Sequence, residues 1–139
     1  RTSTPFGIHP TKKSFPLWIK ENLEAKKEIP VLVDQFTSPT YVPNLSKMLI
    51  EITTRQITGI LHVSGATRIS RYALAELVAD KLHLDKSLLI PTKIDTMNWK
   101  AQRPKDSSLN TSLASENLNE QPQKIEKSLE LFINELNSN

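Results

Sequence analysis

One stretch limits the possible folds more than any other, because it joins two elements of different kind. The run Ile29–Val33 is apolar and largely β-branched, which predicts a buried strand. Asn44 precedes apolar residues at helical spacing, which predicts a helix with Asn44 as its cap. The polar stretch from Asp34 to Val42 between them contains Pro39, which restricts its own φ and the conformation of Ser38. We therefore expect a rigid, polar connection between a strand and a helix.

The rest of the chain alternates between the same two kinds of element. Apolar residues at helical spacing predict three more amphipathic helices, opened by Ser14, Ser70 and Pro122. Short apolar runs predict strands at Ile60–Val63 and Leu88–Pro91. Short strands that alternate with amphipathic helices predict an α/β fold.

The segment from Thr92 to Gln121 has almost no apolar periodicity. Long structureless runs are uncommon inside compact domains, so two explanations stay open. The segment is either a disordered tail or a functional segment that lies over a neighbouring surface.

Composition restricts the classes of function. A chain of 139 residues suits a single domain, and without cysteine it has neither disulfides nor thiolate metal sites. No apolar run approaches the roughly 20 residues that cross a bilayer, so we expect no membrane partner and a cytoplasmic location. The net charge of +3 is spread along the chain, which argues against nucleic acid and favours a small anionic ligand. His9 and His62 stand alone, so we predict no metal site and a packed, hydrogen-bonded His62.

Several short motifs follow one another in a fixed order along most of the chain. Together they resemble the C-terminal half of the dTDP-4-dehydrorhamnose reductases, which are extended short-chain dehydrogenases/reductases. The motifs are Arg1-Thr-Ser3, Gly7, Phe15, Asp34-Gln35, Ser38-Pro-Thr40, Gly59 to Gly65, Ser70-Arg-Tyr72 and Gln102-Arg-Pro-Lys-Asp-Ser-Ser-Leu109. The resemblance implies the C-terminal substrate-binding portion of an NAD(P)-binding Rossmann-fold enzyme.

In that family, a nicotinamide cofactor passes hydride to a 4-keto sugar, helped by a Tyr-x-x-x-Lys pair and a glycine-rich phosphate loop. Neither motif occurs here: Tyr41 is followed four residues later by Leu45, and Tyr72 by Glu76. We therefore expect residues 1–139 to be a single substrate-binding domain fragment that lacks its N-terminal Rossmann portion. The fragment should be inactive and bind no cofactor, whereas the full-length protein should use NADPH or NADH.

The resemblance also implies roles for individual residues. Thr2 and Ser3, at the end of a Rossmann strand, are expected near the cofactor. Thr4, where the family often has a sugar-contacting Trp, is expected at the substrate. Arg103 suits a pyrophosphate because its planar fork donates paired hydrogen bonds, although a structural ion pair with Asp106 or a bond to a backbone carbonyl is an even alternative. Neutral hydrogen bonds to the substrate are expected from Gln35, Thr40 and Ser107.

Two other functional readings stay open. The regulatory subunit of methionine adenosyltransferase is similar over the same region, including its Gln-Arg-Pro motif, and would bind a partner enzyme without turnover. Another nucleotide-sugar epimerase or reductase is the second alternative. We also expect the chain to form homo-oligomers, because removal of a Rossmann half would uncover a strand edge and apolar surface.

Overall fold

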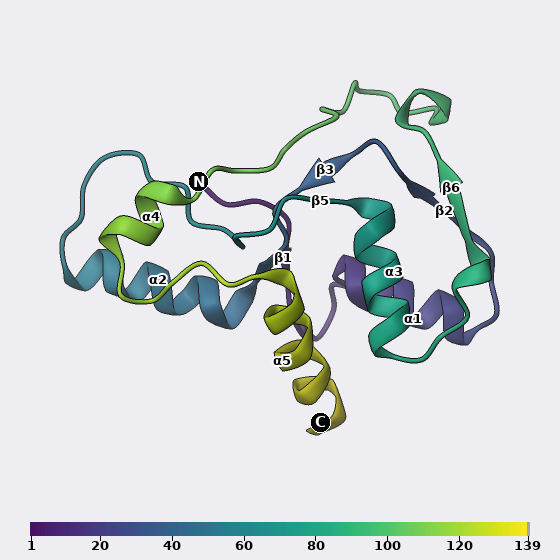
Figure 1. Ribbon diagram of the computed structural model, residues 1–139, viewed down its shortest axis with the longest axis horizontal. Helices are drawn as coiled ribbons and strands as arrows, with labels where there is room; N and C mark the ends of the chain where they lie inside the picture. The colour runs from purple at the N-terminus through teal and green to yellow at the C-terminus, as the bar shows by residue number, and fades with distance from the viewer. Residues whose placement is uncertain (139) are drawn as a thin grey trace.

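The computed structural model describes residues 1–138, which form an α/β arrangement of short strands and amphipathic helices (Figure 1). The strands are β1 (Pro5–Phe6), β2 (Ile29–Leu32), β3 (Phe36–Thr37), β4 (Thr40–Tyr41), β5 (Ile69–Ser70) and β6 (Leu89–Thr92). The helices are α1 (Phe15–Glu24), α2 (Val42–Thr54), α3 (Arg71–Lys81), α4 (Ser112–Asn117) and α5 (Ile125–Ser138), with single 3₁₀ turns η1 (Lys86–Leu88) and η2 (Ile94–Thr96).

The strands pair two by two. β2 and β6 are parallel, with Ile29 opposite Leu89 and Leu32 opposite Thr92. β1 pairs in parallel with β4, and β3 pairs antiparallel with β5. These pairs place the polar connection after β2 beside the start of the chain and the start of α3.

The larger core lies between α1, α3 and α5 and the strands β1, β2 and β6. Periodic apolar positions of α1 and α3, such as Ile19 and Leu74, are completely buried there. The Phe6 ring lies edge-on to Phe132 of α5, with centroids 5.6 Å apart, which fixes the last helix against the first strand.

A smaller core attaches α2 to the C-terminal part of the chain. Met48 of α2 packs with Val63, Ala114 and Leu118, and all four are buried. Residues 112–117, where no helix is predicted, form α4 because Ala114, with Leu118 just after the helix, packs on this apolar face. The C-terminal part of the Thr92–Gln121 segment is thus packed against α2 and is not a disordered tail, whereas a functional role for the segment stays a prediction.

Four predicted elements are confirmed. α1 begins directly after Ser14, although the Ser14 hydroxyl is buried without a hydrogen-bond partner. The Ser70 hydroxyl caps α3 by accepting from Ala73 N at 3.1 Å. The strand at Leu88–Pro91 appears as β6, and α5 starts shortly after Pro122.

Two other predictions are wrong. α2 begins at Val42, because Pro43 suits the first turn of a helix, so Asn44 already lies inside it. The Asn44 amide instead donates to Glu120 Oε1 at 2.7 Å. The predicted strand Ile60–Val63 has no ladder among residues 1–138, and only isolated bonds join it to Arg1, including Val63 N to Arg1 O at 2.7 Å.

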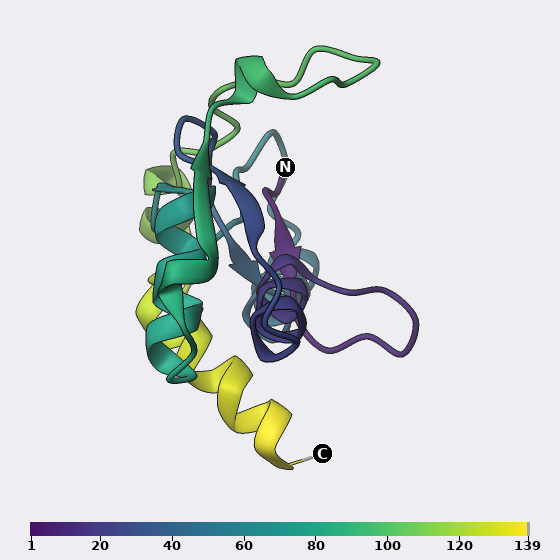
Figure 2. The same cartoon turned by 90° about the vertical axis from the view of Figure 1, so that its right-hand side faces the viewer.

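Residues 93–105 form an arm that projects from the body of the molecule, drawn in green at the top of Figure 2. η2 begins the arm, and Ile94 N at its start donates to Asp34 Oδ1 at 2.8 Å. The arm therefore starts from the polar connection that follows β2.

Candidate functional site

The hydroxyls of the polar connection point into the protein. Thr37, Ser38 and Thr40 are all buried, and Ser3 is only 6% exposed. Ser3 Oγ lies 3.0 Å from Thr37 Oγ1 and donates to the Ser107 carbonyl oxygen at 2.9 Å. This hydroxyl network joins residues 1–4, 34–41 and 105–109, which are far apart in the sequence.

Thr40 is the most constrained member of the network. Its hydroxyl donates to the Ser3 carbonyl oxygen at 2.6 Å and accepts from Gly65 N at 3.0 Å. A Cβ at Gly65 would overlap the Pro39 carbonyl oxygen, so only glycine allows this approach. Thr40 therefore holds the connection together from inside.

The residues predicted near the cofactor and the substrate differ in how far their side chains are exposed to solvent. Thr2 is exposed, whereas the Ser3 hydroxyl is committed to bonds within the chain. Thr4 has a left-handed φ of 40° and bonds to the Thr37 hydroxyl. Ser107 is exposed, and its hydroxyl donates to the Phe36 carbonyl oxygen at 3.2 Å. The structure thus gathers these residues at one place but turns several of their hydroxyls inward, and their roles as ligands stay predictions.

The predicted alternative of an Arg103–Asp106 ion pair is wrong. Asp106 Oδ2 accepts instead from Arg68 Nε at 2.9 Å. Hydrogen bonds from the Ser108 hydroxyl and Ser108 N, and then the bond from Arg68, lower the pKa of Asp106 to about 2. The Arg68 guanidinium also lies over the Phe36 ring, 3.8 Å from its centroid.

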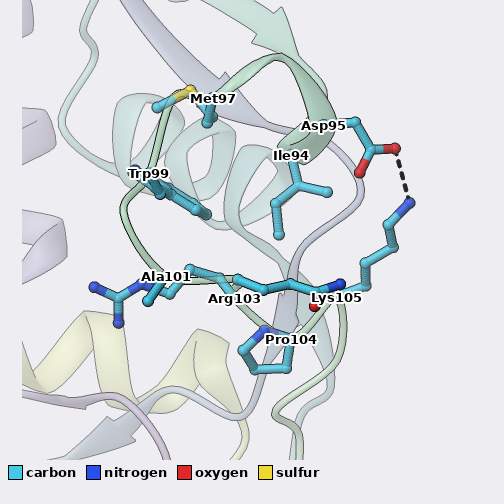
Figure 3. Close-up of a pocket in the computed structure, with 9 residues that line it drawn as sticks. Ile94, Asp95, Met97, Trp99, Ala101, Arg103, Pro104 and Lys105 are labelled. Carbon is cyan, nitrogen blue, oxygen red and sulfur yellow. Dashed lines mark hydrogen bonds and ion pairs between the residues drawn. The ribbon is translucent and has the colours of Figure 1, made fainter.

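Arg103 instead lines a pocket of ≈ 590 Å³ in the arm. The arm runs out through Ile94, Met97 and Trp99 and returns through Arg103 to Lys105, so that the two stretches face each other (Figure 3). The Arg103 guanidinium lies 5.8 Å from the Trp99 ring centroid, and within residues 1–138 no carboxylate is within ion-pair distance of it. Lys105 Nζ, in contrast, is held 3.1 Å from Asp95. Arg103 is thus placed to pair with an anion from outside the chain.

A second pocket, of ≈ 340 Å³, adjoins the first, and Met97 and Trp99 line both. It combines aromatic and apolar side chains with two polar ones. The residues are Phe15, Trp18, Pro30, Val31, Leu32, Gln35, Arg71, Met97 and Trp99. Gln35, predicted as a substrate ligand, lies here and donates to the Pro104 carbonyl oxygen over a long 3.4 Å.

Sequence reasoning missed Arg71. Arg71 is half-buried, its guanidinium lies 4.8 Å from the Phe15 ring centroid, and burial lowers its pKa. A signal for Arg71 was present in the sequence. It is a cation in the first turn of a helix, where the helix dipole disfavours positive charge.

Three further observations on residues 1–138 concern metal binding, His62 and membrane-spanning helices. No three His, Asp or Glu side chains there are grouped so that they could hold a metal ion. His62 is half-buried, and its Nδ1 lies 3.2 Å from the Asn110 carbonyl oxygen, as expected of a packed histidine. None of the helices in this range has both the length and the apolar character needed to cross a membrane.

Comparisons with known proteins identify the family of this chain. The family model described as the RmlD substrate binding domain matches residues 1–138. The crystal structure of dTDP-4-dehydrorhamnose reductase from Bacillus anthracis in complex with NADP is 27% identical, with a TM-score of 0.88 over 97% of this chain and 47% of that one. A hypothetical dTDP-4-dehydrorhamnose reductase from Sulfolobus tokodaii is 30% identical, with a TM-score of 0.78 over 90% of this chain and 43% of that one.

A curated relative points the same way. The probable low-salt glycan biosynthesis reductase of Haloferax volcanii is 24% identical over 98 residues, which are 70% of this chain and 33% of that protein. The chain spans less than half the length of each of these relatives. The relatives are reductases, and their α/β fold is that of the extended short-chain dehydrogenases/reductases. The chain belongs to the family of RmlD substrate binding domains.

Proposed function

We propose that this chain is the substrate-binding half of an NADPH-dependent reductase that acts on a nucleotide sugar, converting a 4-keto to a 4-hydroxy group on a dTDP-linked sugar. The family match over residues 1–138 and the similarity to a reductase crystallised with NADP support the proposal. The substrate and the cofactor of the whole protein are part of this proposal.

The observation that carries the proposal is the position of Arg103. It lines a pocket, contacts an aromatic ring and has no carboxylate partner within the described chain. A guanidinium forms short, paired, charge-assisted hydrogen bonds with phosphate oxygens. Lysines on the same arm, Lys93 and Lys100, add positive charge that would attract a diphosphate.

Hydride transfer itself would be carried by groups outside this sequence, which contains no Tyr-x-x-x-Lys motif. The N-terminal Rossmann portion would supply the cofactor site and the proton donor. This half would hold the nucleotide sugar so that its keto carbon lies near Thr2 and Thr4, at the start of the chain.

The test is a turnover assay on the protein that contains this chain, with dTDP-4-keto-6-deoxy sugar and either NADPH or NADH. We expect oxidation of the reduced nicotinamide that depends on the sugar nucleotide, and faster turnover with NADPH. Epimerised sugar without net oxidation would favour the epimerase alternative. No turnover, together with co-purification of a methionine adenosyltransferase, would refute the reductase and favour the regulatory subunit.

A further inference from the structure

The pocket in the arm contains a carboxylate as well as the guanidinium of Arg103. Asp95 lines it from the outgoing stretch of the arm and Arg103 from the returning stretch (Figure 3). A free carboxylate at this place would repel the oxygens of a diphosphate and offset the positive charge of Arg103. An anionic ligand would therefore gain affinity from any group that neutralises Asp95.

Lys105 is placed to neutralise Asp95. Its Nζ lies 3.1 Å from Asp95 Oδ2 and 4.0 Å from Asp34 Oδ2, so one ammonium group faces two carboxylates. In Figure 3 the Lys105 ammonium points toward Asp95, whereas the Arg103 guanidinium points to the opposite side. The pairing of Lys105 thus leaves Arg103 as the cation that the pocket can offer to an anion.

The contact between Lys105 and Asp95 is poorly suited to a purely structural role. The two side chains are 60% and 73% exposed, and ion pairs so exposed stabilise a fold little. Backbone bonds already hold the returning stretch of the arm. Phe36 N donates to the Lys105 carbonyl oxygen at 2.7 Å, and Ser107 N donates to the Phe36 carbonyl oxygen at 3.0 Å. Removal of the Lys105 side chain should therefore change the charge of the pocket more than its shape.

We propose that Lys105 raises the affinity of the pocket for an anion by neutralising Asp95 and the neighbouring Asp34, without contacting the anion itself. The inference rests on the proposed function, in which the anion is the diphosphate of the nucleotide sugar. It adds a residue that controls the affinity of this site through the charge of a second residue.

The test is a double-mutant cycle on the protein that contains this chain, titrated calorimetrically with inorganic pyrophosphate at low ionic strength. Arg103→Ala identifies the part of the binding that belongs to this pocket. Lys105→Met should weaken that part about five- to tenfold, because methionine keeps the apolar stem but leaves Asp95 and Asp34 unpaired. The double variant Asp95→Asn with Lys105→Met should return to within about twofold of the wild type, because the repelling charge of Asp95 is gone.

Salt and a matched variant distinguish repulsion from structural damage. The loss of affinity in Lys105→Met should shrink in about 0.5 M salt relative to the loss in Arg103→Ala, because salt screens repulsion at an exposed site. Lys13→Met is the matched control, since it breaks an ion pair of a similarly exposed lysine with Glu21 outside the arm, and it should bind like the wild type. Circular dichroism of each variant checks that the fold is kept.

The outcomes separate this inference from the proposed function. If the double variant binds as weakly as Lys105→Met, Lys105 contacts the anion directly, and the inference is overturned while the nucleotide-sugar function stands. The inference also fails if Lys105→Met binds like the wild type. If Arg103→Ala binds pyrophosphate as well as the wild type, or if the folded wild type binds none, the pocket is not the diphosphate site. The observation that carries the proposed function then fails together with the inference.

Discussion

The hydroxyl of Thr40 should contribute far more stability than its size suggests. Replacement by valine keeps the shape of the side chain but leaves Gly65 N and the Ser3 carbonyl oxygen without their partner in the interior. Each buried polar group left unsatisfied costs about 1 to 3 kcal/mol. We expect Thr40→Val to lower the free energy of unfolding by roughly 2 to 4 kcal/mol, since some relaxation of the loop is available.

Urea denaturation followed by circular dichroism measures this loss. With an m-value of about 2 kcal/mol/M, the midpoint should fall by about 1 to 2 M. Thr53→Val is the matched control, because the Thr53 hydroxyl bonds to the Leu49 carbonyl oxygen on an exposed helix surface. The control should change stability by less than about 0.5 kcal/mol. Equal midpoints for the two variants would refute the role given to the buried hydroxyl.

Four further predictions concern binding, packing, charge and assembly. Arg103→Ala in the whole protein should raise the apparent KM for the substrate about ten- to a hundredfold and leave the apparent KM for NADPH unchanged. Lowered thermal stability with unchanged kinetics would show a purely structural role for Arg103. Gly65→Ala should cost about 3 kcal/mol in urea, because its Cβ overlaps a backbone oxygen, whereas Gly59→Ala, which meets no atom but has a φ of 98°, should cost only about 1 kcal/mol. Because folding lowers the pKa of Asp106, its stabilisation should be complete above pH 3.8 and fade as the pH falls toward about 2. Asp106→Asn should remove that part of the acid dependence, and an unchanged acid transition would argue against it. Light scattering should show self-association of the isolated chain through its exposed apolar side chains, among them Ile50 and Ile60; a strict monomer would contradict this. Cofactor titration of the same chain should show no binding of NADPH or NADH, and a micromolar affinity would contradict this expectation.

Helices were predictable where apolar periodicity was clear. α1 and α3 begin directly after Ser14 and Ser70 as predicted, although only the Ser70 hydroxyl caps its helix. Strands depend on partners that sequence does not reveal, which is why Ile60–Val63 was wrong and the short pairs around β3 were not foreseen. Asn44 failed as a cap because Pro43 could begin the helix earlier and a distant segment offered its amide a better partner.

The site was predictable in part, for a related reason. Residue type pointed to Arg103, whose guanidinium the structure leaves without a carboxylate partner among residues 1–138. Residue type could not tell an outward hydroxyl from an inward one, and Thr40 proved to be completely buried. Arg71 was missed because only the fold brings it against Phe15 of another helix.

The contact between Phe6 and Phe132 has a consequence for how the chain reaches its folded state. The parallel strand pairs join Pro5 with Thr40 and Ile29 with Leu89, so long loops must close before a few hydrogen bonds form. Such topology slows folding into the range of milliseconds to seconds. During synthesis, Phe6 stays without its edge-on neighbour until α5 has left the ribosome, so the packing of β1 is completed late.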